Sequence, residues 1–292
     1  MIALIGISAF VLGCTSPTPT PTVTPTTQVS SVPSIGQSVT PTSVPNTISG
    51  TITLMGSSSI GPHLDKGTNM SNAFTTAYPN VQTQVSVSDS GTGIKSVEGG
   101  LCDIGMSSRA LTADDGADLN GTIIAYDGIA VIVNSANPIA NLSKQQIVDI
   151  FSGNTTNWKQ VGGSDAAITT FQRESSSGTR SAFNTLVMGK TNVSDSALTA
   201  SNTLNMIQSV KGNPNAIGYC SYGELSSDVK ALQVDGVTLS IATIKDKSYT
   251  IQRPFLLVTK GTPTNPAAIA YINFVMSPQG QSILAQDKLV PV

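Results

Sequence analysis

Gly56-Ser57-Ser58-Ser59-Ile60-Gly61 stands between a short β-rich run, residues 52–55, and a stretch of helical composition, residues 63–78. Two later segments repeat this order of strand, Ser/Gly/Thr cluster and helix: Ser88-Asp89-Ser90-Gly91-Thr92-Gly93-Ile94 and Arg173-Glu174-Ser175-Ser176-Ser177-Gly178-Thr179-Arg180. In open α/β sheets ligands bind at the carboxyl ends of strands, where helix N-termini present free backbone N–H groups. One such corner alone is an ordinary capped turn. Three of them, with an arginine at the third, predict a binding site for an anion.

The rest of the chain supports an α/β fold. Short β-rich runs alternate with helical stretches through residues 50–292, an order typical of mainly parallel sheets. We expect further strands at residues 81–87, 103–106, 128–133, 168–171, 216–220 and 254–258, and helices at residues 143–151, 179–188 and 265–275.

Composition excludes several classes of function. Only 11% of the 292 residues are charged, and 15 Lys+Arg stand against 17 Asp+Glu. A nucleic-acid binder needs a basic excess to neutralise phosphates, so we expect no nucleic-acid partner. One histidine and three cysteines are too few for the usual zinc or haem sites, and we expect neither a metal nor a cofactor. The aromatic fraction of 5% is low for a sugar cleft, which relies on stacking rings.

The chain offers little for catalysis. A Ser-His-Asp hydrolase would have to use His63, the one histidine, and the Gly-x-Ser-x-Gly motif is absent. We therefore expect that the protein is not an enzyme. Cys102 and Cys220 lie in apolar, strand-like runs, so we expect buried free thiols, with a disulfide between them as the alternative.

The N-terminal residues have the composition of an export signal and a tether. Residues 1–14 form a short apolar run that ends in Leu12-Gly13-Cys14 and resembles a lipobox, although no Lys or Arg precedes it. The run is shorter than the roughly 20 residues that span a bilayer, so we expect a signal peptide with lipidation at Cys14, the alternative being an ordinary exported protein. Residues 15–49 hold seven of the 16 prolines and no charge, which predicts a disordered tether. We expect an extracytoplasmic protein anchored to the outer face of the cell membrane.

Short motifs follow one another in a fixed order along residues 51–292. They are Gly-Ser-Ser-Ser-Ile-Gly-Pro (56–62), Ser-Gly-Thr-Gly-Ile (90–94), Asp-Ile-Gly-Met-Ser-Ser-Arg (103–109), Asp-Gly-Ile-Ala-Val-Ile-Val-Asn (127–134), Ile-Phe-Ser-Gly-Asn (150–154), Ser-Gly-Thr-Arg (177–180), Ala-Ile-Gly-Tyr (216–219), Arg253-Pro254 and Ser-Pro-Gln-Gly-Gln (277–281). In this order they resemble the phosphate-binding proteins of phosphate ABC importers.

The resemblance implies a fold and a function. The fold is the two-lobed class II periplasmic-binding architecture with a ligand cleft between lobes, in which lobe 1 comprises residues 50–129 and 253–292 and lobe 2 comprises residues 130–252. The function is the binding of inorganic phosphate and its delivery to the permease subunits of an ABC importer by closure of the cleft, with the protein acting as a monomer. The alternatives are a binding protein for another oxyanion, such as sulfate or molybdate, and a surface lipoprotein for phosphate sensing or adhesion.

The resemblance also carries phosphate contacts onto hydroxyls and amides of the three corners, onto one arginine and onto the position of Ser108. These residues are Ser58, Ser59, Ile60, Ser90, Ser108, Arg173, Ser177, Gly178 and Thr179. Arg173 is expected to donate charge-assisted hydrogen bonds to the anion.

Ser108 departs from the pattern of the family. Some members carry an Asp there, which accepts the proton of phosphate and so excludes sulfate. A Ser hydroxyl both donates and accepts, and does not reject sulfate by itself. Asp127 is our candidate acceptor instead, the alternative being that it is a turn or cap residue. Arg109 either reaches the cleft or pairs with a carboxylate.

Overall fold

The computed structural model describes residues 47–292, which belong to one compact unit. The predicted signal peptide, Cys14 and residues 15–46 of the predicted tether lie outside the described residues. Strands of this unit join into one sheet in the order β2 (Val81–Ser88), β1 (Gly50–Ser57), β3 (Ile104–Ser107), β11 (Gln252–Lys260), β4 (Leu119–Asn134), β8 (Ala216–Ser221), β6 (Thr169–Arg173) and β7 (Leu198–Ala200), with β9 (Val229–Ala231) paired to β4. Parallel pairs lie at both ends of this order and antiparallel pairs in the middle.

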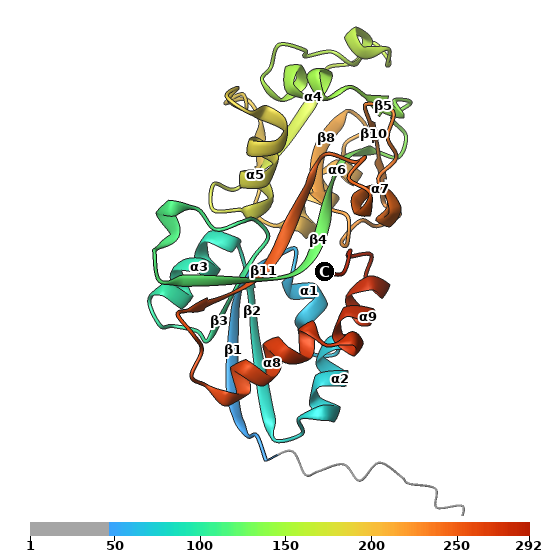
Figure 1. Cartoon of the computed structure of the whole chain (residues 1–292). Helices are drawn as coiled ribbons and strands as arrows, with labels where there is room; N and C mark the ends of the chain where they lie inside the picture. The colour runs from blue at the N-terminus through green and yellow to red at the C-terminus, as the bar shows by residue number, and fades with distance from the viewer. Residues whose placement is uncertain (1–46) are drawn as a thin grey trace, which may run out of the picture. The chain divides into compact units, whose positions relative to one another are not determined.

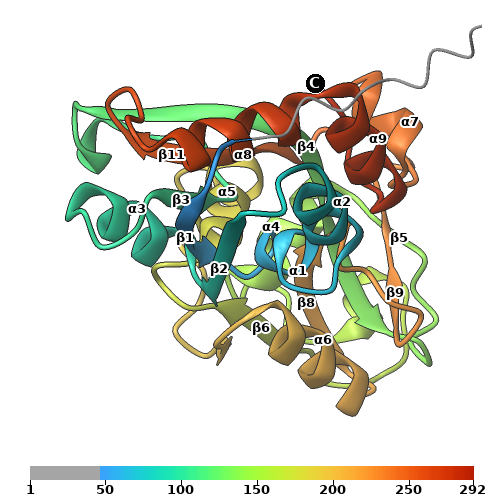
Figure 2. The ribbon, with the colours of Figure 1, turned by 90° about the horizontal axis from the view of Figure 1, so that it is seen from below.

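Lobe 1 is built on three parallel strands. The strands are β1 (Gly50–Ser57), β2 (Val81–Ser88) and β3 (Ile104–Ser107), and the helices are α1 (Gly61–Leu64), α2 (Asn69–Ala77), α3 (Ser90–Glu98), α8 (Pro266–Met276) and α9 (Pro278–Gln286), with a 3-10 turn η1 (Ala113–Asp115). Leu54 and Phe74 belong to the apolar cluster under α1, α2, α8 and α9, whereas Ile94 and Val97 of α3 belong to a second cluster. Figure 2 shows α3 and α2 on opposite sides of these strands.

Lobe 2 has its own core. Its strands are β5 (Asn141–Leu142), β6 (Thr169–Arg173), β7 (Leu198–Ala200), β8 (Ala216–Ser221), β9 (Val229–Ala231) and β10 (Gln233–Val234). Its helices are α4 (Lys144–Phe151), the 3-10 turn η2 (Trp158–Val161), α5 (Gly178–Phe183), the π-helical turn η3 (Asn184–Met188), α6 (Thr203–Gly212) and α7 (Ile241–Lys245). Phe151, Phe183 and Tyr219 contact one another in the centre: the Phe183 and Tyr219 rings stack with centroids 4.1 Å apart, and the Phe151 ring is tilted against both.

Two long antiparallel strands connect the lobes. β4 (Leu119–Asn134) and β11 (Gln252–Lys260) run side by side from one lobe to the other (Figure 1). On β4 the side chains belong to the lobe 1 core up to Ala125 and to the lobe 2 core from Ile129. Between these two positions Asp127 stands opposite Arg253 of β11 in the strand register.

The structure confirms the α/β class and corrects three elements. The stretch 63–78 is not one helix, because Gly67 has a φ of +89° and the Thr68 side chain caps a new helix by accepting from the Ser71 N–H. The stretch 179–188 changes from α to π geometry at Asn184. The strand expected at 128–133 extends back to Leu119, because its first half pairs with β11, a contact between distant segments that local composition does not reveal.

Two further observations concern cysteines and membranes. Cys102 and Cys220 are buried and free, which confirms the expectation for both thiols. Among residues 47–292, no helix combines the length and the apolar character needed to cross a bilayer.

Candidate functional site

The three Ser/Gly/Thr corners of the sequence meet where lobe 1 faces lobe 2. Ser59 Oγ of the first corner lies 3.1 Å from Thr179 Oγ1 of the third. The Gly91 N–H of the second corner donates to the Ser176 carbonyl of the third at 3.0 Å. Gly178 has no room for a side chain, because a Cβ there would collide with the hydroxyl oxygen of Ser90. The convergence expected from the sequence is therefore present.

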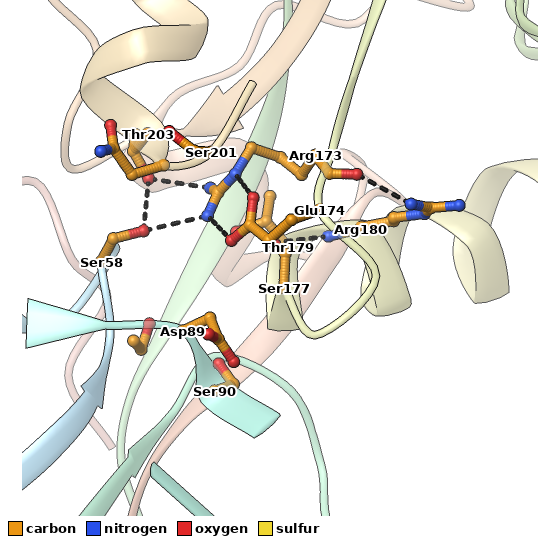
Figure 3. A network of polar contacts seen from close by, with 12 residues as sticks. Ser58, Asp89, Ser90, Arg173, Glu174, Ser177, Thr179, Arg180, Ser201 and Thr203 are labelled. Carbon is orange, nitrogen blue, oxygen red and sulfur yellow. Dashed lines mark hydrogen bonds and ion pairs between the residues drawn. The ribbon is translucent and has the colours of Figure 1, made fainter. Parts of the chain in front are cut away.

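Arg173, the last residue of β6, points its guanidinium into this junction (Figure 3). Nη1 donates to Thr203 Oγ1 and Nη2 to Ser58 Oγ, both at 3.1 Å. The edge formed by Nε and Nη2 also pairs with Glu174, at 2.8 Å from Nε and 2.6 Å from Nη2. The Arg173 backbone N–H donates to the Tyr219 hydroxyl at 3.1 Å, which fixes the end of the strand. Arg173 is 1% exposed and thus joins hydroxyls of both lobes inside the protein.

Arg253 is a second guanidinium in the same junction, and sequence reasoning missed it as a site residue. Nε and Nη2 donate to Asp127 Oδ2 at 3.1 and 2.9 Å. Nη1 donates to Thr179 Oγ1 at 2.7 Å and to the Ser108 carbonyl at 3.1 Å. Nη2 also donates to Ser59 Oγ at 3.3 Å. The Arg-Pro dipeptide was visible in the sequence, but only the pairing of β11 with β4 places its side chain here.

Asp127 is the carboxylate that holds Arg253. Its side chain is fully buried, and Oδ1 accepts from the N–H groups of Tyr222 and Gly223 at 3.0 and 3.4 Å. Burial raises the pKa of Asp127, and the facing Arg253 guanidinium opposes that rise. Asp127 lies within β4 and is not a turn residue.

Ser90 and Ser108 form the lobe 1 side of the junction. Ser90 is the first residue of α3, and its Oγ accepts from the Ser108 N–H at 3.0 Å. The two hydroxyl oxygens lie 3.1 Å apart. Asp89 caps the same helix by accepting from the Thr92 N–H at 2.8 Å.

We call the buried group of eight residues at the junction the polar cage. Its members share hydroxyl or guanidinium side chains that are at most 8% exposed: Ser58, Ser59, Ser90, Ser108, Thr179, Thr203, Arg173 and Arg253. Thr203, the first residue of α6, was not expected from the sequence, and no local signal distinguishes it from an ordinary helix start.

Three expected residues have local roles next to the polar cage. The Ile60 N–H donates to the Ser57 carbonyl at 3.0 Å within the first corner. The Ser177 side chain caps α5 by accepting from the Arg180 N–H at 3.2 Å. Arg109 pairs with Asp115 through two contacts of 2.6 Å, which settles the alternative left open for this arginine.

The polar cage offers many hydrogen-bond donors and two positive charges, each next to a carboxylate. Such a set suits a small oxyanion, which accepts hydrogen bonds at every oxygen. Among the described residues no cluster of three His, Cys, Asp or Glu side chains is arranged to hold a metal ion. His63 lies outside the polar cage with its two ring nitrogens 3.1 Å from Asp287 Oδ2 and 3.2 Å from Glu224 Oε1, so both face carboxylates rather than a serine.

A cavity of about 580 Å³ opens beside the polar cage. Ser58, Val87 and Asp89 line it from lobe 1, and Ser201 and Leu204 line it from lobe 2. Its wall thus includes one hydroxyl of the polar cage and residues from both sides of the cleft.

Comparison with known proteins gives first the class of the protein and then the family. A family model described as a PBP superfamily domain matches residues 41–279. The phosphate-binding protein PstS of Bacillus subtilis is 31% identical over 250 residues, which cover 84% of this chain and 81% of that protein. The crystal structure of a putative phosphate ABC transporter substrate-binding protein with bound phosphate from Clostridium perfringens is 38% identical, with a TM-score of 0.80 over 83% of this chain and all of that one. The chain belongs to the family of the phosphate-binding proteins of phosphate ABC importers.

Proposed function

We propose that this protein binds inorganic phosphate outside the cytoplasm and delivers it to an ABC importer by closure of the cleft. The observation that carries the proposal is the polar cage, in which both lobes supply buried hydroxyls around two guanidinium groups. A dianion loses its hydration on binding, so nearly every lone pair must meet a donor. The names of the relatives, phosphate-binding proteins and a transporter substrate-binding protein, support the same function.

The proposed mechanism is a hinge motion. Lobe 1, residues 50–129 and 253–292, would bind the anion first through Ser59, Ser90 and Ser108. Lobe 2, residues 130–252, would then close and add Arg173 and the start of α5. We propose Ser58, Ile60, Ser177, Gly178, Thr179 and Asp127 as the remaining site residues, together with Thr203, which the structure adds.

The remaining proposals concern attachment and assembly. The protein acts as a monomeric binding protein and not as an enzyme. A lipid on Cys14 holds it at the outer face of the membrane, with residues 15–49 as the tether. Mass spectrometry of the membrane-associated protein tests the lipid, since an unmodified Cys14 would contradict this proposal.

Another oxyanion is a specific alternative, because the Ser108 hydroxyl can donate a hydrogen bond to sulfate as well as to phosphate. Titration calorimetry of residues 44–292 with phosphate, sulfate, molybdate and arsenate tests both functions. We expect the tightest binding for phosphate or its analogue arsenate. Saturation by sulfate without binding of phosphate would overturn the proposed function.

A further inference from the structure

The two guanidinium groups of the polar cage make the same pattern of contacts. Each donates to one hydroxyl of lobe 1 and to one hydroxyl of lobe 2. Arg173 donates to Ser58 and Thr203, as described above, with 3.1 Å in both cases. Arg253 donates to Ser59 at 3.3 Å and to Thr179 at 2.7 Å. Each guanidinium thus donates to a pair of hydroxyls, one from each lobe.

An arginine fixes the role of each hydroxyl oxygen that it contacts. A guanidinium has five N–H donors and no acceptor, so the hydroxyl oxygen must accept and its own hydrogen must point to another group. Ser59 Oγ and Thr179 Oγ1 lie 3.1 Å apart, so one of these two hydrogens bonds the neighbouring oxygen and the other is directed elsewhere. A buried hydroxyl hydrogen needs an acceptor. Thr203 Oγ1, 3.5 Å from Ser59 Oγ, is one acceptor within reach, and an oxyanion in the polar cage would provide another.

Arg253 itself has no donor left for an anion. Its five N–H groups are accounted for by two bonds to Asp127, two to Ser59 and Thr179, and one to the Ser108 carbonyl. Its guanidinium carbon also lies 5.2 Å from the centroid of the Phe255 ring. These contacts hold the Arg253 side chain in place. Because no N–H group is left over, Arg253 can act on a ligand only through the residues that it contacts.

We propose that Arg253, held by Asp127, is a positioning residue of the anion site that orients the Ser59–Thr179 hydroxyl pair so that the free hydrogen of the pair is donated to the bound oxyanion. This inference rests on the proposed function of the polar cage. In this role Asp127 contributes to the site by holding Arg253 in place, whereas in the sequence-based hypothesis Asp127 accepts the proton of phosphate directly. The two roles differ in their effect on selectivity, which makes them separable.

A double-mutant cycle tests the positioning role. The variants are Arg253→Gln, Thr179→Val and their combination, and phosphate affinity is measured by calorimetry on residues 44–292. We expect Arg253→Gln to weaken binding at least tenfold, and Thr179→Val to weaken it about tenfold in the parent protein but less than threefold in the Arg253→Gln background. An unchanged affinity of Arg253→Gln, or losses that multiply in the double variant, would overturn the proposal.

Structural damage must be separated from loss of positioning. Urea unfolding of each variant without phosphate reports its stability. If Arg253→Gln does not fold, the cycle is repeated with Arg253→Lys, which keeps a positive charge at the same position. A lysine lacks the planar fork that reaches Ser59 and Thr179 together, so we expect the same non-additivity with Thr179→Val. Asp115→Asn is the matched control, since it removes the carboxylate of an arginine pair outside the polar cage, and its phosphate affinity should stay within twofold.

The cycle also distinguishes failure of this inference from failure of the proposed function. If the parent protein does not bind phosphate, the proposed function is wrong, and the cycle is repeated with the oxyanion that the calorimetric panel identifies. Non-additivity with that anion would still support the positioning role, whereas additive losses would contradict it.

Discussion

The two arginine–carboxylate pairs of the polar cage differ in where their partners come from. Arg173 and Glu174 are neighbours in the chain, and the Glu174 side chain is 21% exposed. Arg253 and Asp127 are far apart in the chain, and neither side chain is more than 1% exposed. Water can replace Glu174 as a partner of its arginine but has no access to the second pair. The first pair therefore tolerates the loss of its carboxylate better than the second.

The largest effects on phosphate affinity are expected at the two arginines, and Arg173 tests the first pair. Arg173→Ala removes the donors to Ser58 and Thr203 and the charge that faces the ligand, so we expect binding to weaken at least tenfold, or about 1.4 kcal/mol. Titration calorimetry measures this change. An unchanged dissociation constant would remove Arg173 from the site.

Asp127→Asn tests the buried pair directly. Loss of the carboxylate leaves Arg253 less firmly held, so we expect phosphate affinity to fall three- to tenfold and the free energy of unfolding to fall by about 3 kcal/mol. If Asp127 acts through Arg253, sulfate affinity falls by the same factor. A fall in the phosphate-over-sulfate ratio would instead support Asp127 as the direct acceptor of the phosphate proton.

Glu174→Gln should have a smaller effect than Asp127→Asn. The Gln side chain keeps one acceptor for the Arg173 guanidinium, and solvent reaches the rest. We expect less than a threefold change in phosphate affinity and a change in unfolding free energy below about 1 kcal/mol. A larger loss than for Asp127→Asn, measured by the same calorimetry and urea unfolding, would reverse the ranking of the two pairs.

The pair of Arg109 and Asp115 gives a baseline outside the polar cage. Hydrogen bonds from Arg109 lower the pKa of Asp115 to about 2. A carboxyl whose folded-state pKa lies below its unfolded value stabilises the protein above the unfolded pKa, and this contribution disappears as the pH falls toward the folded pKa. Asp115→Asn should therefore lower the unfolding free energy by about 1–2 kcal/mol at neutral pH, and the difference should shrink between pH 5 and about pH 2. A difference that does not change with pH would contradict this assignment.

The sequence predicted those parts of the site that depend on neighbours in the chain. Each Ser/Gly/Thr corner joins a strand to a helix within one continuous segment, so Ser59, Ser90 and Thr179 were recognisable from local pattern. The α/β class followed from the same alternation. Thr203 and the role of Arg253 could not be predicted in this way. Both depend on which distant segments pack together, and a single sequence without that pairing does not specify them.

The same reasoning explains the errors in the elements. The helix expected from His63 to Tyr78 is divided by the conformation of Gly67, a backbone property that a helical composition hides. The first half of β4 is a strand because β11 supplies its partners. Asp127 lies in that pairing, so its position opposite Arg253 could not be predicted from the local sequence.

The position of the Arg253–Asp127 pair on the two crossing strands has a consequence for turnover. The two residues stand opposite each other in the strand ladder that links the lobes, so the pair sits on the pivot and can persist when the lobes swing apart. The bond from Arg173 to Ser58, by contrast, joins the two moving bodies and must break with every opening. After each release the Arg253 guanidinium is therefore already in position for the next anion, and only the contacts of Arg173 have to form again.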